Sequence, residues 1–145
     1  MKKILVINGP NLNMLGKREP EIYGSKTLDE INTELSQKAL DLGIEISFFQ
    51  SNSEGEIVSK LNHEFQKIDG LIINAAAYTH TSIAIRDAVS MHKIPVCEVH
   101  LSNIYQREEF RHKSYLSDIA AGVICGFGDM VYFLALQALA QIIKS

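Results

Sequence analysis

The feature that most constrains the fold of this chain is a repeated alternation between short apolar runs and longer stretches with helical periodicity. Five of the runs are rich in β-branched residues and continuously hydrophobic, which is typical of strands buried on both faces of a parallel sheet. These runs are Lys3 to Asn8, Ile44 to Phe49, Leu71 to Asn74, Ile94 to Val99 and Gly122 to Cys125. Because parallel strands require crossover connections, the alternation predicts an α/β fold.

Apolar residues spaced three or four apart predict the helices between these runs. They form one stripe at Leu28, Ile31, Leu35 and Ala39, a second at Ile57, Leu61 and Phe65, and a third at Ile85, Ala88 and Val89, and a last helix is expected over Asp129 to Lys144. Thr27, with Glu30 three residues on, has the spacing of a capping box at a helix start. Ser53 and Glu56 repeat that spacing, and Gly43 is expected to end the first helix.

Five strands that alternate with helices predict a three-layer sandwich, in which helices cover both faces of a parallel sheet. Right-handed crossovers leave few topologies, and we predict the flavodoxin-like strand order 2-1-3-4-5. The length of 145 residues suits a single domain over residues 1–145, and 46% hydrophobic residues are enough for its core. In such a fold the ligand binds beyond the carboxyl ends of the strands, so functional residues are expected at that edge.

Charge and hydropathy exclude several classes of function. The net charge is −3, and no basic cluster is interleaved with aromatic residues, so neither nucleic acid nor an anionic membrane is suggested as a partner. The N-terminal apolar stretch is short and lacks a small-residue cleavage site, which favours a first strand over a signal peptide. The nearly uncharged stretch from Ala120 to Ile143 is interrupted by glycines and Asp129, which favours a strand and a helix over a transmembrane segment.

The two cysteines indicate a reducing compartment. Cys97 and Cys125 lie within apolar runs, which favours buried thiols over a disulfide or a nucleophile. We therefore expect a cytoplasmic protein.

Polar side chains follow or end three of the predicted strands at the carboxyl edge. Asn8 and Asn11 follow the first strand, Asn74 ends the third, and Glu98 and His100 lie on the fourth. Because side chains alternate along a strand, Glu98 and His100 point to the same side, where a carboxylate can orient an imidazole and hold it protonated. A paired core histidine is the alternative for an isolated Glu-x-His, but the position at the carboxyl edge favours a role in catalysis.

The segment from Gly9 to Lys26 shows no periodicity, and a connection of this length in a compact domain is typical of a functional loop. Its central part lies between Gly16 and Gly24, which can act as hinges, and carries Arg18 and Tyr23. A phenol is a weak base at neutral pH, but a nearby guanidinium favours the phenolate, so Tyr23 could abstract a proton. The alternative is an exposed loop tyrosine beside a solvated arginine.

Two further segments could bind an anion. After the third strand, hydroxyl residues between Asn74 and Ser82 are expected to cap a helix whose free N–H groups favour negative charge. Arg107 and Arg111 lie four residues apart and could hold a carboxylate or hydroxyls. Ion pairing of these arginines with the neighbouring glutamates on a solvated surface is equally compatible with the pattern.

Neither a metal nor a cofactor is expected. The histidines show no metal-ligand spacing, and they are His63, His80, His92, His100 and His112. The segment from Gly9 to Gly16 lacks the Gly-Lys-Ser/Thr ending of a phosphate-binding loop. A non-catalytic flavodoxin-like module, either a flavin carrier or a signalling receiver, is the main rival interpretation. Asn8 argues against it, because a receiver needs an acidic cluster after the first strand.

Five stretches, in order along nearly the whole chain, closely resemble the type II 3-dehydroquinate dehydratases. They are Asn8 to Asn13, Arg18 to Gly24, Tyr78 to Ser82, Glu98 to Asn103 and Arg107 to Arg111. The resemblance implies a lyase without cofactors that dehydrates 3-dehydroquinate to 3-dehydroshikimate by anti elimination through an enolate. The reaction would serve the shikimate pathway to chorismate and aromatic amino acids, or quinate breakdown. The resemblance also implies trimers, four of which form a homododecamer.

The resemblance assigns roles residue by residue. Tyr23 matches the general base, Arg18 the residue that activates it, and His100 the acid that protonates the departing hydroxyl. Asn11 matches a residue that stabilises the enolate through water, and Glu98 is expected to orient His100. The positions that match substrate-binding residues are Asn74, His80, Arg111, the backbone N–H groups of Leu101 and Ser102, and Asp87 from a neighbouring subunit.

One position departs from the family pattern. Many members have proline after the asparagine that ends the third strand, whereas Ala75 follows Asn74 here. The fixed φ of proline is therefore missing, and the aim of Asn74 depends on other contacts. We expect altered affinity rather than lost chemistry. A lyase that uses the same site on another polyhydroxy acid stays open as a closer alternative.

Overall fold

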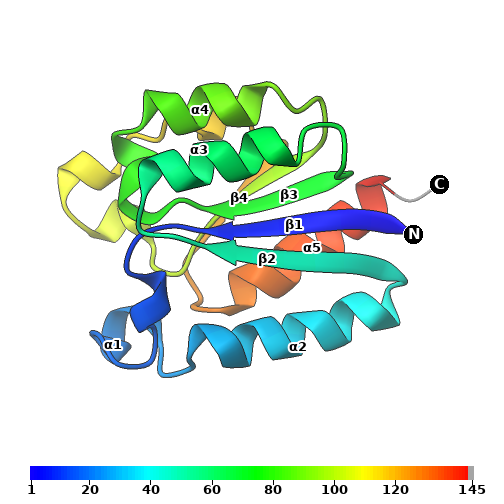
Figure 1. The fold of residues 1–145 in the computed structure, drawn as a ribbon. Helices are drawn as coiled ribbons and strands as arrows, with labels where there is room; N and C mark the ends of the chain where they lie inside the picture. Colours follow the sequence, from blue (N-terminus) through cyan, green and yellow to red (C-terminus); the bar gives the residue numbers. More distant parts are fainter. Residues whose placement is uncertain (144–145) are drawn as a thin grey trace.

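The computed structural model describes residues 1–143 and contains a five-stranded parallel sheet with the strand order β2-β1-β3-β4-β5 (Figure 1). The strands are β1 (Lys2–Asn8), β2 (Ile44–Gln50), β3 (Gly70–Asn74), β4 (Val96–His100) and β5 (Gly122–Cys125). The predicted strands and their order are confirmed. The largest difference is at β4, which begins two residues later than predicted because Pro95 has no N–H to donate to a ladder.

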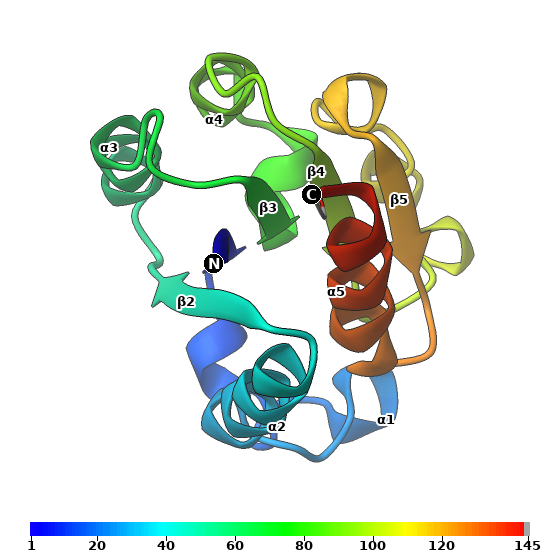
Figure 2. The ribbon, with the colours of Figure 1, turned by 90° about the vertical axis from the view of Figure 1, so that its right-hand side faces the viewer.

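Helices cover both faces of the sheet, as predicted. The long helices are α2 (Leu28–Asp41), α3 (Glu54–His63), α4 (Ile83–Ser90) and α5 (Met130–Ile143). Figure 2 shows α2 and α5 on one face and α3 and α4 on the other. Lys144, which was predicted to end the last helix, lies outside the described residues. None of the helices within residues 1–143 has the length and hydropathy needed to cross a bilayer.

The central position of β1 in the sheet explains why its sequence is continuously apolar. Ile4 and Val6 pack into the cluster beneath α2 and α5, whereas Leu5 and Ile7 pack into the cluster beneath α3 and α4. All four side chains are fully buried. Because side chains alternate along a strand, a central strand must be apolar at every position to fill both clusters.

The helix-start signals are confirmed at one position and only half confirmed at another. Thr27 and Glu30 form the predicted reciprocal capping box at α2. Ser53 accepts the hydrogen bond from the Glu56 N–H, but the Glu56 carboxylate binds the Ser51 hydroxyl instead of completing the box. The prediction that Phe65 extends the apolar stripe of α3 is wrong, because α3 ends at His63 and Phe65 is 44% exposed.

The loop after β1 contains two short helical turns, η1 (Leu12–Met14) and α1 (Pro20–Tyr23). Gly16 and Gly24 have φ angles of +87° and +93°, so both hinge positions need a residue that tolerates the left-handed region. A Cβ atom on Gly16 would lie 2.9 Å from the Ser25 carbonyl oxygen, so the two ends of the hinged segment are in contact. We call residues 17–24 the lid.

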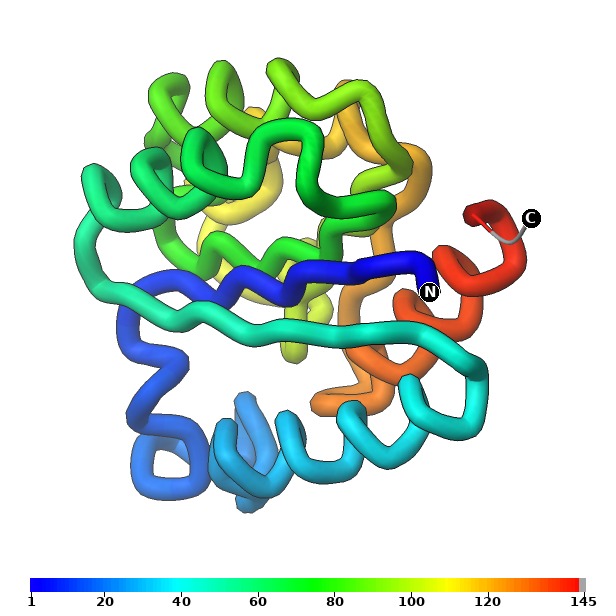
Figure 3. Tube along the Cα trace, turned by 45° about the vertical axis from the view of Figure 1, so that its right-hand side comes forward, coloured from blue at the N-terminus to red at the C-terminus, as the bar shows by residue number. Residues whose placement is uncertain are grey.

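The loops that follow the strands gather at one end of the sheet, and the start of β1 lies with the end of α5 at the other (Figures 1 and 3). The loop after β3 contains η2 (Ala76–His80), and the long connection after β4 contains η3 (Ile104–Gln106), η4 (Glu109–Arg111) and η5 (Ser117–Ile119). The lid and these loops together surround the carboxyl edge. Candidate functional residues from distant parts of the sequence therefore meet there.

Ala75, where the resemblance led us to expect proline, has a backbone conformation that proline could adopt. Ala75 has φ −76°, and Asn74 before it is in an extended strand, as proline requires of its predecessor. We therefore expect Ala75→Pro to raise the free energy of unfolding by about 0.4–1 kcal/mol, through loss of freedom in the unfolded chain. Urea denaturation measures this change.

The neighbouring alanine provides a matched control. Ala76 has φ +53°, which the proline ring forbids, so Ala76→Pro should destabilise the fold. Because Ala75 is fully buried, a loss of stability in Ala75→Pro would show that the site cannot accommodate the ring.

Candidate active site

A pocket of about 150 Å³ opens at the carboxyl edge of the sheet, where the sequence predicted the functional residues. Nine of the predicted site residues line it, and they are Asn11, Arg18, Tyr23, Asn74, His80, His100, Leu101, Ser102 and Arg111. They come from the loop after β1, which includes the lid, from β3 and β4, and from the loops that follow these two strands. The fold thus brings together side chains that are up to 100 residues apart in the sequence.

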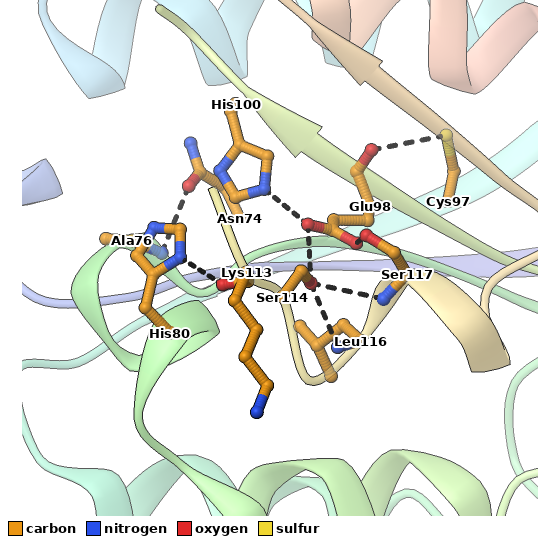
Figure 4. A network of polar contacts seen from close by, with 10 residues as sticks. All are labelled: Asn74, Ala76, His80, Cys97, Glu98, His100, Lys113, Ser114, Leu116 and Ser117. Atoms are coloured by element: carbon orange, nitrogen blue, oxygen red, sulfur yellow. Dashed lines mark hydrogen bonds and ion pairs between the residues drawn. The ribbon is translucent and has the colours of Figure 1, made fainter. Parts of the chain in front are cut away.

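Behind the pocket lies a buried carboxylate. Glu98 and His100 are 0% and 5% exposed, and the Nε2–H of His100 donates to the Glu98 carboxylate at 2.5 Å. Burial raises the pKa of Glu98, but hydrogen bonds from His100 and two serines outweigh that effect and hold the pKa below its ordinary value. Glu98 is therefore ionised at neutral pH. It fixes the ring of His100, whose other ring nitrogen points away from it (Figure 4).

His80 stands beside His100 with its ring nearly parallel, at 6.1 Å between centroids and 21° between planes. Its Nδ1 lies 2.7 Å from the Lys113 carbonyl oxygen, which can only accept, so Nδ1 carries a proton. Burial lowers the pKa of His80, which makes it neutral at pH 7. Its Nε2 is then an acceptor available to a hydroxyl in the pocket.

The phenol of Tyr23 lies beside two guanidinium groups. The Cζ atoms of Arg18 and Arg107 are 4.8 Å and 5.2 Å from the centroid of its ring. Arg18 Nη2 also approaches the Tyr23 hydroxyl at 3.5 Å. The phenol oxygen thus faces the pocket next to the cations that line it.

Three arginines give the pocket a positive lining. Arg18, Arg107 and Arg111 all border it, although Glu108 pairs with Arg111 at 2.8 Å and with Arg107 at 3.9 Å. Sequence reasoning left open whether the last two arginines face a ligand or a solvated surface, and they border the pocket while paired with Glu108. A pocket with three guanidinium groups suits a small anion.

Asn74 is aimed by a buried tyrosine on α5. Its Nδ2 donates to the hydroxyl of Tyr132 at 3.0 Å, and its Oδ1 accepts from the Ala76 N–H at 3.2 Å. The Tyr132 hydroxyl donates in turn to Asn8 Oδ1, and burial raises the pKa of this phenol so that it keeps its proton. The amide still has one hydrogen and one lone pair for a ligand. These contacts fix Asn74 in the absence of proline at position 75.

The chain can approach Asn74 closely because residue 9 is glycine. The Gly9 N–H donates to the Asn74 carbonyl at 2.8 Å, and a Cβ atom on Gly9 would lie only 2.4 Å from the Ala75 carbonyl oxygen. Asn11 follows with φ +69°, and its N–H donates to Asn52 Oδ1 at 3.0 Å. The tight turn after β1 thus directs Asn11 to the wall of the pocket.

Asp87 is the one predicted substrate-binding residue that lies away from the pocket of its own chain. It is exposed on α4, and the neighbouring Arg86 pairs with Asp118 at 2.5 Å. This position leaves Asp87 free to face another molecule.

The remaining histidines do not enter the pocket. His92 and His112 bond through Nε2 to the backbone carbonyls of Leu61 and Arg107, at 2.8 Å and 3.1 Å, and His63 is exposed on α3. Within residues 1–143 no three His, Cys, Asp or Glu side chains come together as metal ligands could.

The two cysteines differ in burial. Cys97 is buried as predicted, which raises the pKa of its thiol to about 11, but Cys125 is only partly buried.

Sequence reasoning missed four side chains of the site. Arg107 was noted but not chosen, although its spacing from Arg111 was a usable signal. Tyr132 lies within an apolar helix, where nothing in the pattern separates a hydrogen-bonded tyrosine from a packed one. Ser114 and Ser117 lie in a polar stretch without periodicity, and only their donation to Glu98 identifies them.

The contacts of Tyr132 lead to a test of how Asn74 is held. Tyr132→Phe should lower the free energy of unfolding by about 1–3 kcal/mol, because it leaves the buried amides of Asn8 and Asn74 without their shared partner. It should also raise KM, because Asn74 loses its fixed orientation. Tyr105→Phe is the control, since Tyr105 is 61% exposed and should stay within about 0.5 kcal/mol of the parent. Equal effects of the two changes on unfolding and KM would contradict this account.

Comparison with known proteins identifies the family of this chain. The family model described as Dehydroquinase class II matches residues 2–140. A protein named 3-dehydroquinate dehydratase from Geotalea daltonii is 62% identical over 142 residues, with 98% of this chain and 99% of that protein covered. Another of that name from Prochlorococcus marinus is 59% identical over 141 residues, with 97% of each covered.

A solved structure gives the same result for the fold. The type II dehydroquinase of Propionibacterium acnes superposes with a TM-score of 0.93 at 42% sequence identity, covering 97% of each chain. A matched family model over nearly the whole sequence, relatives of this identity and the shared fold lead to one conclusion: the chain belongs to the class II dehydroquinase family.

Proposed function

We propose that this pocket dehydrates 3-dehydroquinate with Tyr23 as the base and His100 as the acid. The chain, as a member of its family, is a 3-dehydroquinate dehydratase that forms 3-dehydroshikimate. The observation that carries the division of roles is that one pocket holds a phenol beside two guanidiniums and an imidazole fixed by a buried carboxylate.

Binding would begin with the carboxylate of the substrate. Within residues 1–143 the backbone N–H groups of Leu101 and Ser102 have no hydrogen-bond acceptor, and both residues line the pocket. Together with Arg111 they can receive a carboxylate. His80 and Asn74 can then orient the ring through its hydroxyls, with the acceptor nitrogen of His80 and the free positions of the Asn74 amide.

Proton abstraction follows from the position of Tyr23. The phenolate removes a proton from the carbon next to the ketone, and the electron pair moves to the carbonyl oxygen to give an enolate. Arg18 and Arg107 lie beside the Tyr23 ring, where they can stabilise negative charge in the transition state, and Asn11 stabilises the enolate through a water molecule. Because these groups are already in place, little reorganisation is needed when the negative charge develops.

Elimination follows from the position of His100. The enolate collapses, the carbon–oxygen bond breaks, and its electron pair leaves with the oxygen, which takes a proton from His100 and departs as water. Glu98 holds the imidazole in the orientation from which it delivers this proton. Tyr23 then releases its proton to solvent and His100 takes one up from solvent, which restores the starting state. The proposed cycle uses no metal or organic cofactor.

We also propose that the chain acts as one domain and assembles into trimers and then a dodecamer. Support comes from Asp87, which is exposed and outside its own pocket. It also comes from apolar side chains beside the unpaired edge of β5, where Val123 is 42%, Phe127 83% and Met130 55% exposed. A cytoplasmic location and a place in the shikimate pathway fit the two free cysteines and the family.

The base and the acid should fail differently when they are removed. Tyr23→Phe keeps the ring but lacks the ionisable oxygen, so kcat should fall about 10²–10⁴-fold with little change in KM. His100→Ala should also lower kcat, but exchange of the substrate's α-proton with solvent should continue while elimination stalls. Product absorbance and deuterium incorporation measure the two processes. Near wild-type kcat in Tyr23→Phe would rule out the tyrosine base and direct attention to His80 or His100.

The role of Arg18 can be tested separately from that of Tyr23. In Arg18→Ala the cation beside the Tyr23 hydroxyl is gone, so kcat should fall about 10²–10³-fold, as for the loss of one group that stabilises charge in the transition state. Lys17→Ala is a control within the lid, because Lys17 does not line this pocket. Near wild-type kcat in Arg18→Ala would remove Arg18 from the proposed mechanism.

The shared site can be tested by mixing subunits. Asp87→Ala and His100→Ala should each be inactive alone, but oligomers reassembled from both should regain activity, because some sites then combine an intact His100 with a neighbour's intact Asp87. Light scattering should give about twelve times the 16.2 kDa chain mass. Full activity of Asp87→Ala, or a structure that places Asp87 beyond a water-bridged distance from a neighbour's His80, would overturn the shared site.

A further inference from the structure

The buried Glu98 carboxylate is held from two sides. His100 on the same strand donates to Oε2, whereas Ser114 and Ser117 donate from the connection that follows η4, to Oε2 at 2.9 Å and to Oε1 at 2.6 Å (Figure 4). Both oxygens therefore have a hydroxyl donor besides any contact with the imidazole. A side chain with 0% exposure has no water to supply these bonds in their place.

The hydrogen of the Ser114 hydroxyl can go only to Glu98. The Ser114 oxygen already accepts from the N–H groups of Leu116 and Ser117, at 3.0 Å and 3.1 Å. A hydroxyl with both lone pairs occupied has one remaining function, which is to donate. A donor fixed in this way favours the ionised carboxylate over the protonated acid.

The serine loop is itself anchored to the parts of the fold that form the pocket. The Tyr115 N–H donates to the Thr79 carbonyl at 2.9 Å, and Arg86 on α4 donates to the Tyr115 carbonyl at 2.9 Å. Arg86 also binds both oxygens of Asp118, at 2.5 Å and 3.0 Å. The two hydroxyls thus approach Glu98 from a fixed direction.

We propose that Ser114 and Ser117 are positioning residues for the elimination step: they hold Glu98 ionised and in one orientation, so that His100 delivers its proton to the departing hydroxyl. The proposal rests on the role proposed above for His100. The serines act through Glu98 and do not line the pocket, so substrate binding does not depend on them.

Ser117→Ala is the informative variant, because within residues 1–143 the Ser117 hydroxyl bonds only to Glu98, whereas that of Ser114 also organises its own turn. We expect kcat to fall about tenfold with KM changed less than about twofold. The ratio of α-proton exchange to elimination should rise, because proton abstraction by Tyr23 is untouched. Ser117→Thr, which keeps a hydroxyl, should restore kcat and the ratio.

Two further variants serve as controls. Ser53→Ala tests whether a general loss of stability changes the ratio, and His100→Ala tests whether His100 is the acid. Ser53→Ala removes the cap of α3 far from Glu98, so it should lower the urea midpoint without changing the ratio. If Ser117→Ala lowers exchange and elimination equally, or neither, while His100→Ala raises the ratio, the serine proposal is overturned and the acid assignment stands. If His100→Ala leaves the ratio unchanged, the acid assignment fails and the serine proposal fails with it.

Discussion

The rest of the site depends on one buried negative charge. Glu98 lies on a central strand with no exposed surface, and an unpaired carboxylate there would cost several kcal/mol. The imidazole and two hydroxyls that surround it remove most of that cost. His100 donates from β4, and the two serines donate from the loop beyond η4. The need of one buried carboxylate for hydrogen-bond donors therefore constrains the path of the long connection after β4.

The strands and helices were predictable because each follows from short-range pattern. Continuous apolar runs mark strands that face two clusters, as Ile4 and Leu5 illustrate, and Thr27 with Glu30 marks a helix start from local geometry alone. The failures have local causes that the pattern cannot express. Glu56 had the right spacing for a box but found a better partner in Ser51, and Phe65 lies just beyond the last turn of its helix.

The residues of the candidate site likewise fall into those that the sequence could predict and those that it could not. Residues at strand ends, such as Asn74 and His100, could be placed together because the carboxyl ends of parallel strands share one edge. Contacts between distant segments could not be inferred from spacing. Tyr132 and Asn8 are 124 residues apart, and Ser117 reaches Glu98 across 19 residues that contain short 3-10 turns but no strand pairing to set the register. Side-chain hydrogen bonds of this kind follow from the finished fold and leave no periodic trace in the sequence.

The lid carries both the proposed base and the arginine beside it. Its two ends meet between Gly16 and Ser25, so residues 17–24 form a nearly closed loop. Arg18 and Tyr23 therefore reach the pocket from one segment, whereas His100, Glu98 and the serines belong to the sheet and its anchored loop. A displacement of this segment would remove the base and its neighbouring cation together and leave the proton donor in place, so the position of one loop would control deprotonation without disturbing the acid.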